Sequence, residues 1–260
     1  MKLPFLFGNF VFLHPFSIKK MKKQIPNIIT CLNLVCGCLS IMFTLYMGWW
    51  QIGALMIIAS AVFDFFDGFT ARLLHVSSPI GKDLDSLADI VSFGIAPSMI
   101  TFTFMQGCVE TLSPAEQASV LRFLPYAAFL IPPFSAYRLA RFNHDERQTT
   151  EFRGLATPAN ALFIGYLPFA AQEMPALHNI WVLLFLVVAF SVLLVSDLPM
   201  FSLKFHHFKF KENEIRYIFL ALALFLLLFF HLGAFPMIIL AYILLTIIAL
   251  PFRKKTISHE

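Results

Sequence analysis

Long apolar segments separated by short polar ones make up most of this 260-residue chain. A transmembrane helix needs about 20 mostly apolar residues, so segments of roughly that length, bounded by charge, Pro or Gly, are candidate spans. Eight such segments are predicted, at residues 27–48, 53–75, 86–107, 121–142, 156–173, 179–197, 215–231 and 234–250. The pattern therefore predicts an all-α integral membrane protein, a polytopic helical bundle with about eight transmembrane helices.

The composition agrees with this prediction. Hydrophobic residues make up 59% of the chain and charged residues only 13%, and the mean hydropathy is +0.78, beyond what the core of a soluble domain requires. No internal repeat is recognisable, so residues 25–260 are predicted to form a single membrane-embedded domain. Residues 1–24 combine an apolar, proline-containing stretch with lysines, which is typical of an interfacial or extension segment.

Lys and Arg are concentrated in alternate connections between the predicted spans. They precede the first span, follow the second, surround the end of the fourth, separate the sixth from the seventh and close the chain. Because basic residues near span ends are retained in the cytoplasm, both termini are predicted to face the cytoplasm in a multi-pass protein of the inner (cytoplasmic) membrane. The net charge of +4 comes mostly from these flanks. It favours contact with membrane lipids and is no evidence for a nucleic-acid partner.

Four aspartates interrupt the apolar pattern near the connection between the second and third predicted spans. Asp64 and Asp67 are one turn apart on the first of these helices, and Asp85 and Asp89 are one turn apart on the second. A single carboxylate at the centre of a membrane costs about 2.5–3.5 kcal/mol on insertion scales. Four of them therefore require compensating positive charge.

Divalent cations supply that charge best. Oxygen ligands suit Mg²⁺ or Mn²⁺, with Ca²⁺ as a further option, and two such ions would balance four carboxylates. Paired ions held by carboxylates commonly assist displacement at phosphorus. Gly68 and Ala71 share a face with Asp64 and Asp67, where their small size would let a nucleotide or diphosphate lie against the backbone. Alternatively, the acids could line the path of an ion-coupled transporter, and the small residues could simply pack helices.

The acids belong to a longer motif, D-x2-D-G-x2-A-R-x8-G-x3-D-x3-D, which spans residues 64–89. Every fixed position is filled, by Asp64, Asp67, Gly68, Ala71, Arg72, Gly81, Asp85 and Asp89. This pattern resembles the signature of the CDP-alcohol phosphatidyltransferase family. Within the family the chain looks most similar to the bacterial membrane-bound subgroup that uses serine, through IPNIITCLNLVCG at 25–37, DSLADIVSFGIAPS at 85–98 and RLARFN with GLATPANA at 138–161.

The resemblance implies the fold of that family and transfer of a phosphatidyl group from CDP-diacylglycerol to the hydroxyl of L-serine, giving phosphatidylserine and CMP. It implies that Asp64, Asp67, Asp85 and Asp89 hold two divalent cations, with Asp89 also acting as general base. It further implies that Gly68, Ala71, Arg72 and Gly81 bind the CDP group. The active site would face the cytoplasm, and the family likeness also implies a homodimer.

The acceptor is less closely determined, because the signature reads the CDP group and not the alcohol. The carboxylate of serine needs a cation, and Arg138, Arg141 and Asn143 at the end of the fourth span are the candidates. Asn27 and Thr30, at the start of the first span, could reach the cytidine, although Asn27 could equally cap the helix. Glycerol 3-phosphate or inositol as acceptor remains the alternative within the same family.

Overall fold

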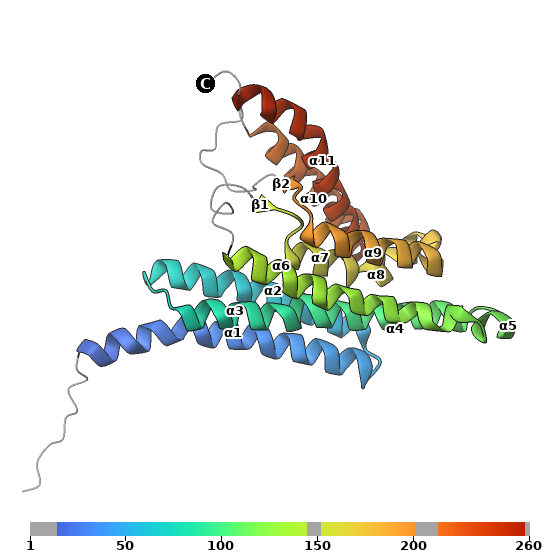
Figure 1. Ribbon diagram of the computed structural model, residues 1–260, viewed down its shortest axis with the longest axis horizontal. Helices are drawn as coiled ribbons and strands as arrows, with labels where there is room; N and C mark the ends of the chain where they lie inside the picture. Colours follow the sequence, from blue (N-terminus) through green and yellow to red (C-terminus); the bar gives the residue numbers. More distant parts are fainter. Residues whose placement is uncertain (1–14, 145–151, 201–212, 258–260) are drawn as a thin grey trace, which may run out of the picture.

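A computed structural model describes residues 15–144, 152–200 and 213–257 of the chain. The described part is almost entirely helical (Figure 1). One short antiparallel pair of two-residue strands, β1 (Phe152–Arg153) and β2 (Pro199–Met200), is the exception to the predicted all-α architecture. The pair joins two connections at the edge of the bundle, with Phe152 opposite Met200.

The first half of the chain forms a block of long helices that lie side by side (Figure 1). α1 (Pro15–Leu45) packs along α2 (Trp50–Leu73). A second long helical stretch consists of α3 (Pro79–Asp89), the π-helical segment η1 (Ile90–Ile95) and α4 (Ala96–Glu110). After the short helix α5 (Pro114–Gln117), the 3₁₀ segment η2 (Val120–Leu130) continues directly into α6 (Ile131–His144).

The second half of the chain uses shorter helices before a terminal hairpin. α7 (Thr157–Ile164), α8 (Leu167–Glu173), the 3₁₀ turn η4 (Pro175–His178) and α9 (Ile180–Val195) cover the first block. α10 (Glu214–Phe230), the 3₁₀ turn η5 (His231–Gly233) and α11 (Ala234–Ile257) follow. The ring centroids of Phe219 and Tyr242 lie 5.7 Å apart, so α10 and α11 pack against each other as a hairpin.

The start of α3 is fixed by local sequence. Ser78 has an extended backbone, and its hydroxyl accepts a hydrogen bond from the backbone N–H of Gly81 at 3.0 Å. Pro79 follows at the first helical position, where the missing N–H costs nothing. The connection from α2 is therefore short, and it holds Asp85 on α3 close to the end of α2.

A π-helical segment interrupts the long helix directly after Asp89. The backbone N–H of Ala96 donates to the carbonyl of Val91, five residues earlier, as a π-helix requires. Pro97 follows and has no N–H with which to continue the α-helical ladder. The extra residue per turn changes which side chains of Ile90–Ile95 face the neighbouring helices.

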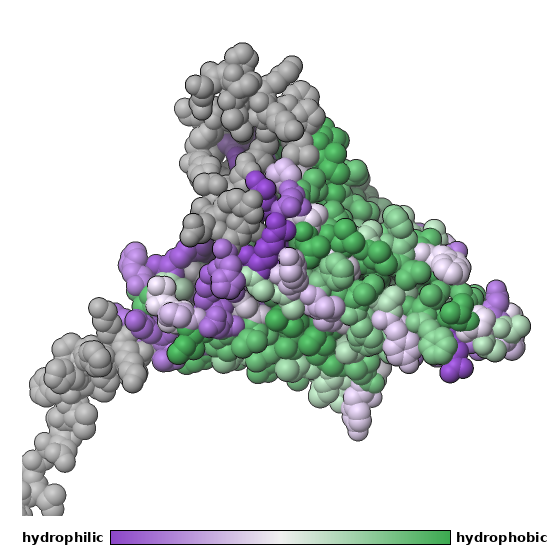
Figure 2. Space-filling model, viewed as in Figure 1, coloured by the Kyte–Doolittle hydropathy of each residue, from purple (hydrophilic) through white to green (hydrophobic). Residues whose placement is uncertain are grey.

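Among the described residues, four helical stretches are long and apolar enough to cross a membrane: Lys22–Leu45, Trp50–Leu73, Pro79–Glu110 and Glu214–Ile248. The last of these contains both α10 and α11, and α9 is a shorter apolar helix. A hydrophobic band covers the face seen in Figure 2, and hydrophilic residues gather at its left edge and around α5 at its right edge. This distribution is that of a membrane protein.

Each of the eight predicted segments contains helix, but three are not one continuous α-helix. The segment 86–107 contains the π-helical segment η1. The segment 156–173 is not one helix: α7 ends at Ile164, and Pro168 in the first turn of α8 cannot donate to the preceding turn. The segment 121–142 begins as a 3₁₀ helix that contains Pro125. The predicted boundary at residue 24 falls inside α1, and residues 1–14 lie outside the described residues. The predicted basic loops at 145–151 and 201–212 also lie outside them.

Candidate active site

Three of the four motif acids converge where α2 ends and α3 begins. Asp64 and Asp67 come from α2 and Asp85 comes from α3. One carboxylate oxygen of each lies within 4.8 Å of the others, which is the spacing of ligands around a metal ion. Three carboxylates this close repel one another unless a cation or protons lie between them. Three of the four acids expected to share one site are therefore found together.

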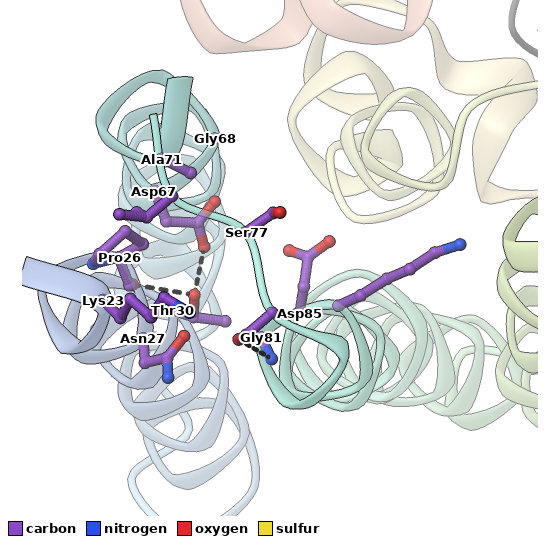
Figure 3. A pocket seen from close by; sticks show the side chains of 13 residues that line it. Lys23, Pro26, Asn27, Thr30, Asp67, Gly68, Ala71, Ser77, Gly81 and Asp85 are labelled. Carbon is purple, nitrogen blue, oxygen red and sulfur yellow. Dashed lines mark hydrogen bonds between the residues drawn. The ribbon is translucent and has the colours of Figure 1, made fainter. Parts of the chain in front are cut away.

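Asp67 and Asp85 of this group have different hydrogen-bond environments. The hydroxyl of Thr30 on α1 donates to Oδ2 of Asp67 at 2.6 Å, and the same hydroxyl contacts the carbonyl of Pro26 at 3.0 Å (Figure 3). The buried Oδ1 of Asp85 has no hydrogen-bond partner among the described residues. A buried carboxylate oxygen without a donor is a suitable ligand for a hard cation.

A cavity of about 260 Å³ opens beside this group (Figure 3). α1, α2, the connection Val76–Ser78 and α3 form its walls. The residues that line it are Lys23, Pro26, Asn27, Thr30, Asp67, Gly68, Ala71, Val76, Ser77, Ser78, Gly81, Lys82 and Asp85. The cavity thus brings together five of the six predicted CDP-binding positions, which are Gly68, Ala71 and Gly81 on α2 and α3 and Asn27 and Thr30 on α1. Arg72 does not line it.

Small residues give this cavity its space. A Cβ placed on Gly68 would meet no atom within 4 Å, so the backbone of α2 is open beside Asp67. A Cβ on Gly81 would lie 3.0 Å from Oδ1 of Asn27 and from Oγ of Ser78, so the glycine permits the close approach of α3 to α1. Arg72 lines an adjoining open depression together with Ala71. Gly68, Ala71 and Gly81 are the positions at which the motif requires small residues.

Asp89 lies one turn further along α3 and is not part of the three-acid group. It is buried, with 7% of its surface exposed, and its Oδ1 accepts a hydrogen bond of 3.2 Å from Nδ2 of Asn33. The Arg138 guanidinium lies within electrostatic reach of this carboxylate. The surroundings of Asp89 are therefore set by Asn33 and Arg138, and not by membership of the three-acid group.

The three predicted acceptor residues on α6 do not form one pocket. Arg138 is buried and donates from Nη1 to the hydroxyl of Thr157 at 2.8 Å. Arg141 instead pairs with Asp197 at 2.5 Å. The amide of Asn143 donates to the hydroxyl of Ser86 at 2.7 Å. Their side chains contact α7, the region after α9 and α3 respectively. Arg138 and Arg141 are one turn apart and reach different elements along α6, whereas Asn143, two residues after Arg141, points to another side of the helix. Of the three, Arg138 is the buried one, and it lies within electrostatic reach of Asp89.

Three residues contribute to this site although no motif position predicts them. Lys23 and Lys82 line the cavity, and they bring positive charge to it. Asn33 contacts Asp89. Lys23, Asn27 and Thr30 are spaced by four and three residues, and Asn33 follows after three more. This helical spacing could have identified one functional face of α1.

Comparison with known proteins places this geometry in a family. The sequence profile of the CDP-alcohol phosphatidyltransferases matches residues 23–195, which include all of the site and leave out the α10–α11 hairpin. The chain belongs to the CDP-alcohol phosphatidyltransferase family. It is therefore related to transferases, and its acids and small residues occupy the positions of that family's motif.

Several curated relatives share one name, CDP-diacylglycerol–serine O-phosphatidyltransferase. The protein of that name from Bacillus subtilis is 32% identical, over 72% of this chain and 92% of its own length. The one from Helicobacter pylori (strain J99) is 32% identical over 66% of this chain and 70% of its own. The one from Mycobacterium bovis is 34% identical over 68% of this chain and 60% of its own. This CDP-alcohol phosphatidyltransferase is thus similar to relatives whose names specify serine.

Proposed function

We propose that this protein transfers the phosphatidyl group of CDP-diacylglycerol to L-serine, giving phosphatidylserine and CMP. The serine hydroxyl oxygen forms a bond to the phosphorus that carries the diacylglycerol. The bond from that phosphorus to the bridging oxygen of CMP breaks, and the hydroxyl proton passes to Asp89. Supporting this proposal are the family membership and the names of the relatives.

The observation that carries the proposal is the adjacency of the three-acid group to an open, small-residue wall. Asp64, Asp67 and Asp85 lie within 4.8 Å of one another, and Asp67 and Asp85 also line the cavity. Gly68 leaves free space in the same wall. A diphosphate could therefore lie on the backbone of α2 while its oxygens bind the same divalent cations that the three acids would hold.

The acids fit a divalent cation by their donor chemistry. Their oxygens are hard ligands, and Oδ1 of Asp85 is buried without another partner in the described part of the chain. Asp64, Asp67 and Asp85 would hold Mg²⁺ or Mn²⁺, and we propose that Asp89 completes a two-ion site. When bound, such ions neutralise phosphate oxygens and the charge that develops on the leaving group.

The remaining cavity residues would hold the CDP group. Lys23 and Lys82 offer positive charge to phosphate. The Lys82 amine donates to the carbonyl of Asn143 on α6 at 2.7 Å, and it would turn to the phosphate when CDP-diacylglycerol binds. Arg72, in the adjoining depression, would meet the outer phosphate oxygens. Asn27 and Gly81 form the wall that the cytidine would contact.

For the acceptor we propose Arg138 as the partner of the serine carboxylate. It is buried near Asp89, and its Nε has no hydrogen-bond partner within the described residues. A carboxylate bound there would place the serine hydroxyl on the side of Asp89. Arg141 and Asn143, which hold the end of α6 in place through Asp197 and Ser86, would support that position.

The membrane arrangement is part of the same proposal. We propose that all eight predicted segments cross the inner membrane, that both termini and the active site face the cytoplasm, and that the protein is a homodimer. The site lies at the end of the bundle where Lys22, Lys23 and Arg141 also lie. Retention of basic residues on the cytoplasmic side supports this orientation.

An acceptor panel tests the proposed function. The purified protein in lipid nanodiscs is given CDP-diacylglycerol with L-serine, glycerol 3-phosphate or inositol, in Mg²⁺ and Mn²⁺ in parallel, and CMP release is measured. Of the three acceptors, only serine should cause the wild-type protein to release CMP. The D64N variant should release none. CMP release with another alcohol and none with serine would reassign the acceptor. Exchange of labelled CMP into the lipid without any acceptor would contradict direct displacement.

A further inference from the structure

Asn33 is the residue of α1 at which the two acid-bearing helices meet. It is completely buried, and three side chains from other elements bond to it. Its Nδ2 donates to Oδ1 of Asp89 at 3.2 Å. Its backbone carbonyl accepts hydrogen bonds from Oγ of Ser60 on α2 at 3.1 Å and from Oγ of Ser92 on η1 at 3.0 Å.

The two serine hydroxyls fix the backbone of α1 at this residue. A carbonyl inside a helix already accepts from the N–H four residues later, and here its remaining capacity is taken up by both neighbouring helices. Gly37, one turn further along α1, allows the contact. A Cβ there would lie 2.5 Å from Oγ of Ser92 and 2.9 Å from its Cα. The position of Asn33 is therefore set by packing and does not depend on its own side chain.

The orientation of the Asn33 amide follows from Asp89. With Nδ2 toward the carboxylate, the amide donates a charge-assisted hydrogen bond, whereas the reverse orientation would place oxygen against oxygen. In this orientation, Oδ1 of Asn33 is buried with no hydrogen-bond partner among the described residues. The free energy gained from the hydrogen bond to Asp89 therefore exceeds the cost of leaving the amide oxygen without a donor.

We propose that Asn33 is a positioning residue for Asp89. Its amide binds Oδ1 and holds the plane of the carboxylate, so that Oδ2 meets the acceptor hydroxyl. This inference rests on the proposed function, in which Asp89 takes the hydroxyl proton. Asn33 touches neither the three-acid group nor the wall of the cavity, so its effect should be confined to the transfer step.

Two variants test this role with opposite effects on packing. N33A leaves space and N33L fills it, and both remove the donor. In each, kcat for serine-dependent CMP release should fall on the order of 10- to 100-fold, as is typical when the partner of a functional group is lost. KM for CDP-diacylglycerol and Mn²⁺ affinity by calorimetry should stay within about threefold of wild type, since Asp64, Asp67 and Asp85 and the residues that line the cavity are unchanged. S40A is the matched control: it removes a buried 2.7 Å hydrogen bond from α1 to the carbonyl of Gly53, far along the helix from the acids, and kcat should be retained.

A double-variant cycle separates positioning from a general loss of structure. If Asn33 acts through Asp89, N33A in the D89N background should lower kcat no further, because the positioned group is already gone. If the losses of kcat in N33A and D89N multiply in the double variant, the proposal is overturned. It is also overturned if N33A or N33L folds and keeps a kcat within about threefold of wild type. Loss of Mn²⁺ affinity in step with kcat would overturn it as well. Failure of the proposed function is recognised separately, as absence of serine-dependent CMP release from the wild-type protein or full activity of D89N.

Discussion

The hydroxyl of Thr30 donates to Oδ2 of Asp67 at 2.6 Å, which ties α1 to one carboxylate of the three-acid group. T30V keeps the shape of the side chain and removes this donor. Because the bond orients a proposed cation ligand, Mn²⁺ affinity measured by calorimetry should weaken about tenfold. T44V is the control on the same helix, since the buried Thr44 hydroxyl has no hydrogen-bond partner among the described residues. Equal Mn²⁺ affinity in T30V and wild type would contradict a role for Thr30 in ordering Asp67.

Gly68 combines a helical position with open space beside Asp67. G68A should raise the free energy of unfolding by up to about 1 kcal/mol, because alanine favours helix over glycine. The same methyl group would occupy the proposed diphosphate position, so KM for CDP-diacylglycerol should rise roughly tenfold. Thermal melting and steady-state kinetics measure the two opposite effects.

Gly107 on α4 provides the comparison for that variant. A Cβ there also meets no atom within 4 Å, but Gly107 lines a different cavity, with Phe104 and His178. G107A should therefore gain stability and keep its KM. A parallel change of KM in both glycine variants would show that helix rigidity, and not blocked space, is responsible.

Asp85 and Asp83 are two residues apart on α3 and have different surroundings. Asp85 belongs to the three-acid group, whereas Asp83 is exposed and lies outside it. D85N should weaken Mn²⁺ binding by ~100-fold or more, beyond the effect of changing a residue that only supports a ligand. D83N should bind Mn²⁺ as the wild type does. Chelation with EDTA should abolish CMP release from wild type and D83N, and added Mg²⁺ or Mn²⁺ should restore it. Activity that persists in EDTA would contradict cation dependence.

D89N should separate binding from transfer. Loss of a general base typically lowers kcat by about 10²- to 10⁴-fold, while Asp64, Asp67 and Asp85 remain to hold the cations and CDP-diacylglycerol. Rapid-quench measurement of a single turnover should show the same loss, with CDP-diacylglycerol binding retained. Near-normal turnover of D89N would show that another group takes the proton.

Arg138 donates to Thr157 and lies near Asp89. R138K keeps the positive charge but loses the planar fork that would hold a carboxylate. KM for serine should rise about tenfold, as expected when one charge-assisted hydrogen bond is lost, and KM for CDP-diacylglycerol should not change. R122K, an exposed arginine on η2 whose guanidinium lies over the Phe123 ring, is the control. An equal rise in both KM values for R138K would indicate a general disturbance of the site.

Much of the fold and the acidic face of the site could be predicted from the sequence. Apolar segments of the right length placed helix in every predicted span, because burial of apolar residues in lipid leaves few other structures for the backbone. The motif placed Asp64, Asp67 and Asp85 on matching faces of two helices, and their convergence followed from helical periodicity together with the short connection between the helices.

The acceptor side of the site could not be predicted in the same way. Arg138, Arg141 and Asn143 are close in sequence, yet they contact different elements. In the sequence, Asn33 is one polar residue within an apolar segment. Its significance comes from the approach of η1 at Gly37 and from the π-helical turn that brings Ser92 to its carbonyl.

The sequence by itself determined the helices and the acidic face that two of them share. Spacing along a helix decides which residues lie on one side of it. Only the tertiary structure decided which side of α1 meets Asp89 and which arginine of α6 points inward. Those relations depend on how closely helices approach and on a local change of helical register, and both arise from contacts between residues far apart in the chain.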